Sequence, residues 1–283
     1  MKLGINLEYF CRDKDDETFS DLCKTAVLLK EHGFSELDFL TNIRRNDWRE
    51  HASAFRAFAD NAGITVHQTH CPFNRYHPEV PDEDFLPLVS RAVDASAILG
   101  AKYMVIHADE YRLAAGEEYS SEKICAAMYD RFAPYVEQAK KQNVGIAIEN
   151  LFEDGCFGNG GRSRYTSTIE ELLSLVERFA DPDVTVCWDF GHAHVAFGND
   201  SLAAFRQALP HLSCTHVHDN THGDQHLIPY LGTLDWTGHL RAMKEQGYSG
   251  NLTYESVYGH IPDALLPAYL DYIRAVGEHL LSL

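Results

Sequence analysis

Six successive strand-like segments of this chain each end in a histidine or an acidic residue. The terminal residues are His70, His107, Glu149, Asp189, His216 or His218, and Glu255. A charged group is costly to bury unless it is paired or bound to a metal, and the strands of a parallel sheet are normally apolar. One such residue alone would indicate a cap or a hydrogen-bonded side chain. Six in succession instead predict that imidazoles and carboxylates converge on a divalent metal.

The residues that precede two of these positions support the same interpretation. Side chains alternate along a strand, so residues i and i−2 share a face. Gly145 and Ala147 share the face of Glu149, and Thr253 shares the face of Glu255. Small side chains below a large acidic one fit a narrow interior that opens into a pocket at its top.

The segment after the seventh strand leaves more than one ligand set open. His216 and His218 share a face, so strand alternation does not decide which of them binds the metal. Farther along, Asp224-Gln225-His226 could contribute an acidic residue and a histidine from a turn, and Asp219 and His222 are competing candidates.

Eight strand-like segments and seven amphipathic stretches must position these residues. The strand-like segments are Lys2–Glu8, Glu36–Leu40, Thr65–His70, Tyr103–His107, Gly145–Glu149, Thr185–Asp189, Ser213–His218 and Leu252–Glu255. The amphipathic stretches are Phe19–His32, Trp48–Ala62, Phe85–Gly100, Glu122–Gln142, Ser167–Phe179, Ser201–Ala208 and Trp236–Gln246. Alternating strands and helices form a parallel sheet, and eight such units favour a closed barrel. The sequence therefore predicts a single-domain (β/α)8 barrel over residues 1–283, with its site at the carboxyl ends of the strands.

Two long loops follow the third and fifth strand segments, over Cys71–Asp84 and Leu151–Tyr165. Long loops after barrel strands lie at the active end. Arg162 and Arg164 in the second loop could bind a phosphate or carboxylate of a substrate, and a surface salt bridge is the alternative interpretation.

The composition argues against nucleic-acid and membrane partners. Lys and Arg number 24 and Asp and Glu number 42, which gives a formal net charge of −18. An acidic surface repels phosphate backbones and anionic lipids. No apolar run approaches the roughly 18–20 residues that span a bilayer, and the seven cysteines include no Cys-x-x-Cys. We therefore expect a cytoplasmic protein.

At these polar residues the chain resembles the xylose isomerase-like TIM-barrel superfamily, specifically the group of sugar phosphate isomerases and epimerases related to endonuclease IV. The similar motifs are Ile148-Glu149-Asn150, Trp188-Asp189-Phe190-Gly191-His192, His216-Val217-His218-Asp219-Asn220, Asp224-Gln225-His226 and Tyr254-Glu255-Ser256.

The resemblance to ketose 3-epimerases implies specific roles. It implies a metal held by Glu149, Asp189, His216 and Glu255, with the two glutamates also moving the substrate proton. It implies that His192 contacts the substrate, and we expect His70, His107 and Trp188 to do so as well. The resemblance to endonuclease IV implies further metal ligands, which are His70, His107, His192, Asp224 and His226.

The predicted function is a metal-dependent isomerase or epimerase that removes a proton next to a carbonyl of a sugar or sugar phosphate. Zn2+ or Mn2+ suits these ligands best, with Mg2+ and Co2+ as alternatives. A metal-dependent hydrolase of the endonuclease IV type and an inosose-type dehydratase are the alternative functions. The expected partner is a small sugar, and a homo-oligomer is compatible with this prediction.

Overall fold

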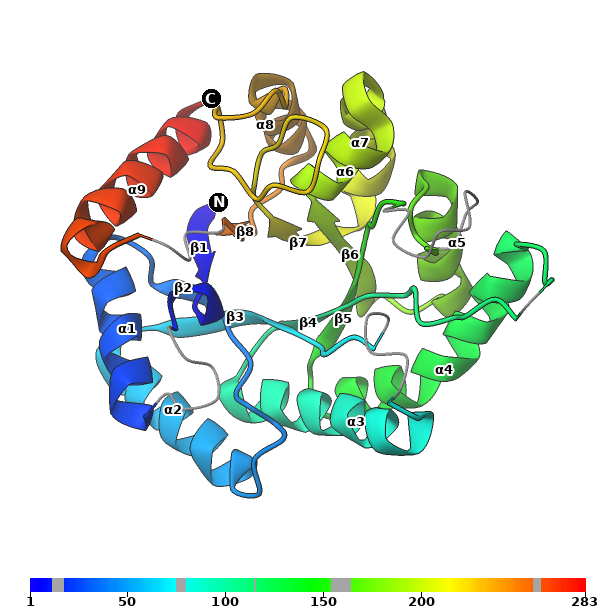
Figure 1. The fold of residues 1–283 in the computed structure, drawn as a ribbon, viewed down its shortest axis with the longest axis horizontal. Coiled ribbons are helices and arrows are strands. Elements are labelled where there is room, and N and C mark those ends of the chain that lie inside the picture. The colour runs from blue at the N-terminus through cyan, green and yellow to red at the C-terminus, as the bar shows by residue number, and fades with distance from the viewer. Residues whose placement is uncertain (12–17, 75–79, 115, 154–163, 257–260) are drawn as a thin grey trace.

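Eight parallel strands form the wall of a barrel in the computed structural model, and helices surround that wall (Figure 1). The strands are β1 (Lys2–Asn6), β2 (Glu36–Asp38), β3 (Thr65–His70), β4 (Tyr103–Ile106), β5 (Gly145–Glu149), β6 (Val184–Asp189), β7 (Leu212–His216) and β8 (Asn251–Tyr254). They are hydrogen-bonded in the order β7-β6-β5-β4-β3-β2-β1-β8. A bridge between Val217 and Tyr254 connects the two ends of this order, so the barrel is nearly closed. The predicted (β/α)8 barrel is confirmed.

The structure describes residues 1–11, 18–74, 80–114, 116–153, 164–256 and 261–283. Within them the α-helices are α1 (Phe19–Glu31), α2 (Trp48–Ala62), α3 (Asp82–Leu99), α4 (Ser121–Lys141), α5 (Ile169–Phe179), α6 (Phe190–Phe197), α7 (Ser201–Ala208), α8 (Trp236–Gln246) and α9 (Leu266–Ser282). Short 3-10 helices cover Glu8–Phe10, Gly198–Asp200, Leu209–His211 and Asp263–Leu265. The sequence predicted seven of the nine α-helices. It missed α9 and also α6, whose first five residues are all buried, so that α6 has no polar face over most of its length.

Glycines end several of the helices. Gly63, Gly100 and Gly247 adopt the left-handed conformation after α2, α3 and α8, with φ of 64°, 73° and 76°. A residue with a β-carbon is strained in this conformation, so glycine stops the helix at little cost and turns the chain toward the next strand.

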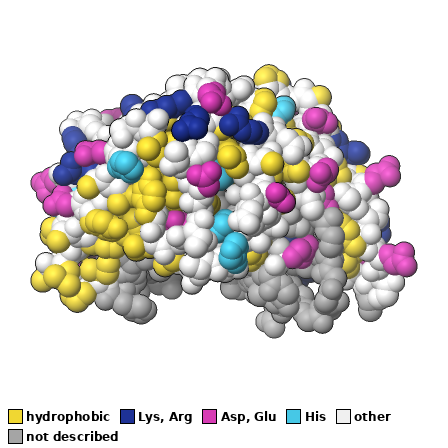
Figure 2. Space-filling model, turned by 90° about the horizontal axis from the view of Figure 1, so that it is seen from above, with side chains coloured by type: hydrophobic (Ala, Val, Ile, Leu, Met, Phe, Trp, Pro, Cys, Tyr) yellow, Lys and Arg dark blue, Asp and Glu magenta, His cyan; other side chains and the backbone are white. Residues whose placement is uncertain are grey.

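The exterior of the barrel is charged but not uniformly so. Figure 2 shows acidic side chains scattered over the whole of one face, whereas the basic side chains gather along its upper edge. Among the described residues, no helix is both long enough and apolar enough to cross a membrane.

Small side chains fill the middle of the barrel below the polar residues at its top. Val105, Ala147, Cys187 and Cys214 form a buried cluster of their own, and the ring of Tyr103 packs against it. A larger core between the strands and the surrounding helices holds most of the other buried apolar residues. The inner cluster therefore packs directly below the polar groups at the strand ends.

A substitution at Gly145 can test how tightly the barrel interior is packed below the polar groups. A β-carbon at Gly145 would lie 2.6 Å from the ring of Tyr103 and 3.2 Å from the carbonyl oxygen of Asp183. Because overpacking a barrel interior forces its neighbours to move, we expect Gly145→Ala to lower the free energy of unfolding in urea by about 1–3 kcal/mol. Gly223→Ala is the control, since its β-carbon would meet nothing closer than 3.9 Å. Equal stability of the two variants would contradict the proposed packing.

Candidate metal centre

A cavity of about 570 Å³ opens at the carboxyl ends of the strands. Its lining includes five of the predicted site residues that end or follow strands, His70, His107, Glu149, His192 and Glu255, together with Asp224 and His226 from the loop after β7. The loop after β2, from Phe39 to Arg45, also lines this cavity. The structure therefore brings most of the sequence-predicted site residues to a single cavity.

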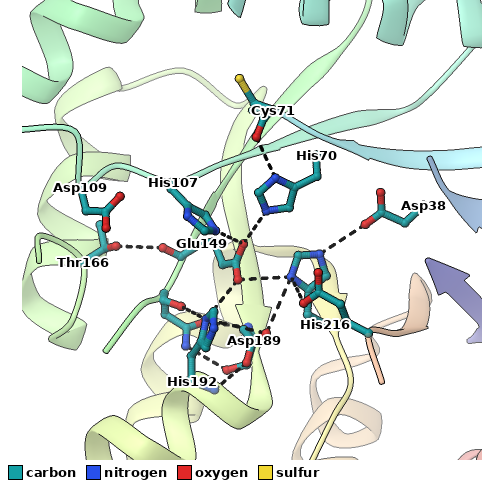
Figure 3. A network of polar contacts seen from close by, with 12 residues as sticks. Asp38, His70, Cys71, His107, Asp109, Glu149, Thr166, Asp189, His192 and His216 are labelled. Atoms are coloured by element: carbon teal, nitrogen blue, oxygen red, sulfur yellow. Dashed lines mark hydrogen bonds and ion pairs between the residues drawn. The ribbon is translucent and has the colours of Figure 1, made fainter. Parts of the chain in front are cut away.

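Glu149 lies at the centre of the cluster, and histidines face both of its oxygens (Figure 3). Oε1 lies 3.1 Å from His192 Nδ1 and 3.2 Å from His216 Nδ1. Oε2 lies 3.2 Å from His70 Nε2 and 3.1 Å from His107 Nε2. Residues from five different strand ends thus meet at one carboxylate.

The first potential metal-binding group consists of Glu149, Asp189, His216 and Glu255. Each offers one ligand atom, all of these atoms lie within 4.8 Å of one another, and all four residues are buried. His216 Nδ1 lies 3.2 Å from Glu149 Oε1, 3.4 Å from Glu255 Oε2 and 3.8 Å from Asp189 Oδ2.

His216 provides the test of whether this group fits a cation. Its side chain is fully buried, and neither ring nitrogen makes a hydrogen bond among the described residues. A buried imidazole nitrogen without such a partner is costly, and three carboxylates around it add repulsion unless a positive charge lies among them. One histidine and three carboxylates form a donor set that suits Zn2+ or Mn2+, so these residues fit a divalent metal.

Two further groups flank the first one. His70 and His107 share Glu149 with it, and His192, His218, Asp224 and His226 form the other. His226 Nε2 lies 3.2 Å from Asp224 Oδ1, and His192 Nε2 lies 4.0 Å from the same atom. The additional residues that the endonuclease IV resemblance implies therefore lie beside the first group.

Main-chain carbonyls orient three of these histidines. Nδ1 of His70 lies 2.8 Å from the Cys71 oxygen, Nδ1 of His192 lies 3.0 Å from the Asn150 oxygen, and Nδ1 of His226 lies 2.5 Å from the Glu255 oxygen. A carbonyl can only accept, so Nδ1 carries a proton in each ring, and Nε2 is the nitrogen that could bind a metal after it has lost its own proton. Metal-binding histidines are typically held in this way.

Electrostatic attraction holds these groups in opposite charge states. Burial would raise the pKa of Glu149, but the neighbouring His216 and His107 lower it well below its usual range. Burial would likewise lower the pKa of His192, but Asp189 and Glu149 raise it to about 10. The same balance, with Glu149 as the opposing charge, raises the pKa of His70 to about 8. The carboxylate of Glu149 is therefore ionised at neutral pH and needs positive charge nearby.

His216 and His218, which strand alternation could not tell apart, have different neighbours. His216 faces the first group, whereas His218 Nε2 lies 2.9 Å from Asp189 Oδ2, and its ring stacks on that of His226 with centroids 3.9 Å apart. A β-carbon at Gly191 would lie 1.9 Å from the His218 ring, so only a glycine there lets His218 approach Asp189.

Asp219, which competed with Asp224 as a ligand in the sequence, instead holds the loop after β7 together. Its carboxylate accepts hydrogen bonds from the backbone N–H groups of Asn220, Tyr230 and Leu234 and from Nε1 of Trp236. With its acceptor positions used in this way, Asp219 lies outside all three potential metal-binding groups of the described residues.

The expectation that Trp188 contacts the substrate is wrong. Its side chain is fully buried and packs against Phe205 and Phe197, with ring centroids 5.3 and 6.4 Å away. Trp188 precedes Asp189 on β6, and because Asp189 faces the barrel interior, strand alternation turns Trp188 toward the helices.

Tyr9 belongs to the site although no sequence motif marks it. It lies in the 3-10 helix after β1, lines the cavity, and makes a side-chain hydrogen bond with Glu255. Burial, reinforced by the charge of Glu255, raises the pKa of the Tyr9 hydroxyl, which therefore stays protonated at neutral pH. A tyrosine beyond the end of a strand carries no spacing signal, so only its position in the fold reveals it.

Arg164 lines the cavity, but its charge is already paired. Its Nε donates a 2.8 Å hydrogen bond to Asp109 Oδ2, and both side chains are buried. A surface salt bridge was the predicted alternative to substrate binding, and the pair that forms is an internal one. Arg162 lies outside the described residues.

Comparison with known sequences supports the resemblance that the motifs indicated. The sequence model described as "Xylose isomerase-like TIM barrel" matches residues 27–276. The chain belongs to this family. The uncharacterized protein y4fM of Sinorhizobium fredii is 28% identical over 185 residues, which are 64% of this chain and 55% of y4fM. This chain therefore spans only about half the length of that relative.

Solved structures share the whole fold. D-psicose 3-epimerase from Clostridium cellulolyticum H10, solved with D-tagatose, superposes with a TM-score of 0.77 at 16% identity and covers 99% of each chain. The IOLI protein, solved with a bound zinc atom, gives a TM-score of 0.75 at 18% identity and covers 100% of this chain and 98% of its own. At these identities the likeness shows the fold alone.

The Arg164–Asp109 pair gives a test of stability near the cavity. Removing one partner leaves an uncompensated buried charge, so we expect Asp109→Ala to lower the free energy of unfolding by about 3–5 kcal/mol in denaturant titrations. Glu245→Ala, which breaks the exposed pair with Arg206, should cost less than about 1 kcal/mol. A similar small loss for Asp109→Ala would mean that the buried pair does not hold this wall of the cavity.

Proposed function

We propose that this chain is a divalent-metal-dependent enzyme that isomerises or epimerises a small sugar by moving a proton next to its carbonyl group. The observation that carries the proposal is the first potential metal-binding group, Glu149, Asp189, His216 and Glu255, whose ligand atoms lie within 4.8 Å of one another at the base of the cavity. The likeness to D-psicose 3-epimerase and to the zinc-binding IOLI protein supports this proposal at the level of the fold.

The two glutamates are the proposed proton-transfer groups. Glu149 ends β5 and Glu255 follows β8, two strands that are separated by β6 and β7 in the barrel. Both side chains reach the cavity, so a substrate between them would have one carboxylate available to remove a proton and the other to return it. A divalent ion held by the first group would act as a Lewis acid toward the carbonyl and hydroxyl oxygens of the sugar.

Other residues of the cavity would position the sugar. His192 and Tyr9 offer polar groups beside Glu149 and Glu255. Phe73 and Phe152 line the same cavity and pack against histidines, with centroids 4.5 Å from His107 and 5.0 Å from His192. Apolar rings beside a few well-placed polar groups are typical of small-molecule sites.

Exchange with solvent deuterium tests the proton-transfer step. We expect the wild-type protein to incorporate deuterium at the carbon next to the carbonyl of one of D-fructose, D-tagatose or L-ribulose. Since general acid–base catalysis contributes about 10²–10⁴-fold, Glu149→Gln and Glu255→Gln should each lower the exchange rate by that factor. Glu31→Gln, which changes an exposed carboxylate on α1, is the matched control. Near-normal exchange in either active-site variant would refute its role.

The metal content of the purified protein tests the other half of the proposal. We expect about one Mn, Zn, Mg or Co per chain by elemental analysis, loss of exchange activity on chelation, and recovery when the metal is added back. A protein that binds none of these metals after reconstitution would contradict the proposal.

A second candidate function is metal-dependent hydrolysis of the endonuclease IV type. It is favoured by the two further groups that flank the first, since a site with several metals suits phosphate-ester cleavage. Two or three zinc ions per chain, together with cleavage of a duplex that contains an abasic site, would support it. The net charge of −18 opposes a nucleic-acid substrate, which is why we place it second.

A further inference from the structure

His216 differs from three of its neighbours in what lies at its Nδ1 atom. His70, His192 and His226 each use Nδ1 for a main-chain carbonyl. His216 instead turns Nδ1 toward Glu149, Asp189 and Glu255. Its ring therefore needs another group, on the Nε2 side, to fix which nitrogen carries the proton.

Asp38 on β2 lies on that side. Its Oδ2 is 3.4 Å from His216 Nε2, and both side chains are buried to 1% exposure or less. Figure 3 shows the two facing each other on the side of the His216 ring away from Glu149. Asp38 lies in the strand predicted over Glu36–Leu40, where no motif marks it as a functional residue.

A chain of buried hydrogen bonds holds the Asp38 carboxylate. Gln68 Nε2 on β3 donates to Asp38 Oδ2 at 3.0 Å, and the Thr253 hydroxyl on β8 donates to Gln68 Oε1 at 3.2 Å. If the Gln68 amide were reversed, its oxygen would face the carboxylate, which repels it. The orientation of the amide is therefore fixed, and Asp38 Oδ2 can only accept from its neighbours.

An acceptor opposite Nε2 selects one form of the imidazole. Nε2 must carry its proton toward Asp38, because a lone pair there would face a carboxylate, and the repulsion is strong between two side chains that are both buried. The neutral ring then has its lone pair on Nδ1, directed at the first group. The opposite tautomer would place a proton where a metal ligand is needed.

We propose that Asp38 is a positioning residue, whose carboxylate 3.4 Å from Nε2 keeps the proton of His216 on that nitrogen and so directs the Nδ1 lone pair to the metal. The inference rests on the metal site of the proposed function. Carboxylates behind metal-binding histidines commonly change metal affinity 10–100-fold when they are removed. In this chain the carboxylate comes from β2, which supplies no member of the three potential metal-binding groups among the described residues.

Zinc affinity measured against a competing chelator tests the effect of Asp38. We expect Asp38→Ala to bind Zn2+ about 10–100-fold more weakly than the wild type. Asp38→Asn keeps an oxygen acceptor without the charge and should lose less. Glu171→Gln, which changes a buried carboxylate on α5 that accepts a 2.6 Å hydrogen bond from the Tyr119 hydroxyl, should keep the wild-type affinity. Wild-type affinity in Asp38→Ala would overturn the proposal.

The protonation state of His216 gives a second, independent readout. Long-range 1H–15N spectra of the zinc-loaded wild type should show a proton on Nε2 and none on Nδ1 of His216. A proton on Nδ1 with a bare Nε2 would refute the role of Asp38 even if Asp38→Ala failed to fold.

The two failures can be told apart. If the wild type binds no Zn2+, the proposed metal site is wrong, but the Nε2–H resonance of His216 can still be compared between the unloaded wild type and Asp38→Asn. A shift of that resonance in the variant would support the contact with Asp38, and an unchanged resonance would exclude it.

Discussion

The carboxylate of Glu149 is almost fully buried, and four imidazoles from different strand ends face its two oxygens. Placing a charge in the interior of a protein is unfavourable unless opposite charge surrounds it. Each charged group of the site would therefore be unfavourable to bury alone, and burial is favourable only when the opposite charges are buried together. The histidine rings are oriented in agreement with this requirement, since each turns a nitrogen toward a Glu149 oxygen.

The parallel barrel is what makes such a cluster achievable. All strands run in the same direction, so their carboxyl ends meet at one rim, and residues far apart in the chain, such as His70 and Glu255, become neighbours. Small residues below the rim leave room for large polar ones above them. Gly145 and Ala147 occupy this place under Glu149. Gly191 likewise leaves room for a large side chain, because the absence of a β-carbon there lets the His218 ring reach Asp189.

The polar groups below the rim form a support of their own. Thr253, Gln68 and Asp38 connect β8, β3 and β2 through buried hydrogen bonds and end at the ring of His216. The loop after β7 is held in a similar way, by the hydrogen bonds that Asp219 accepts. A site that needs fixed ligand positions benefits from rigid supports of this kind, because each ring or carboxylate then has a single favourable orientation.

The sequence by itself determined the barrel and most of the site. Two local patterns carried these predictions: the alternation of strands and helices, and the polar residue at the end of each strand from the third to the eighth. Local patterns can be recognised in a sequence without knowledge of the fold. It could not decide between His216 and His218 or between Asp219 and Asp224, since both members of each pair lie close together in the chain. It also placed Trp188 at the substrate, although strand alternation turns that ring toward the helices. Only the tertiary structure separates these residues, since it puts His216 and His218 in different potential metal-binding groups and Asp219 in none of those among the described residues. Only it revealed Asp38 and Tyr9, because their importance depends on which distant side chain they face.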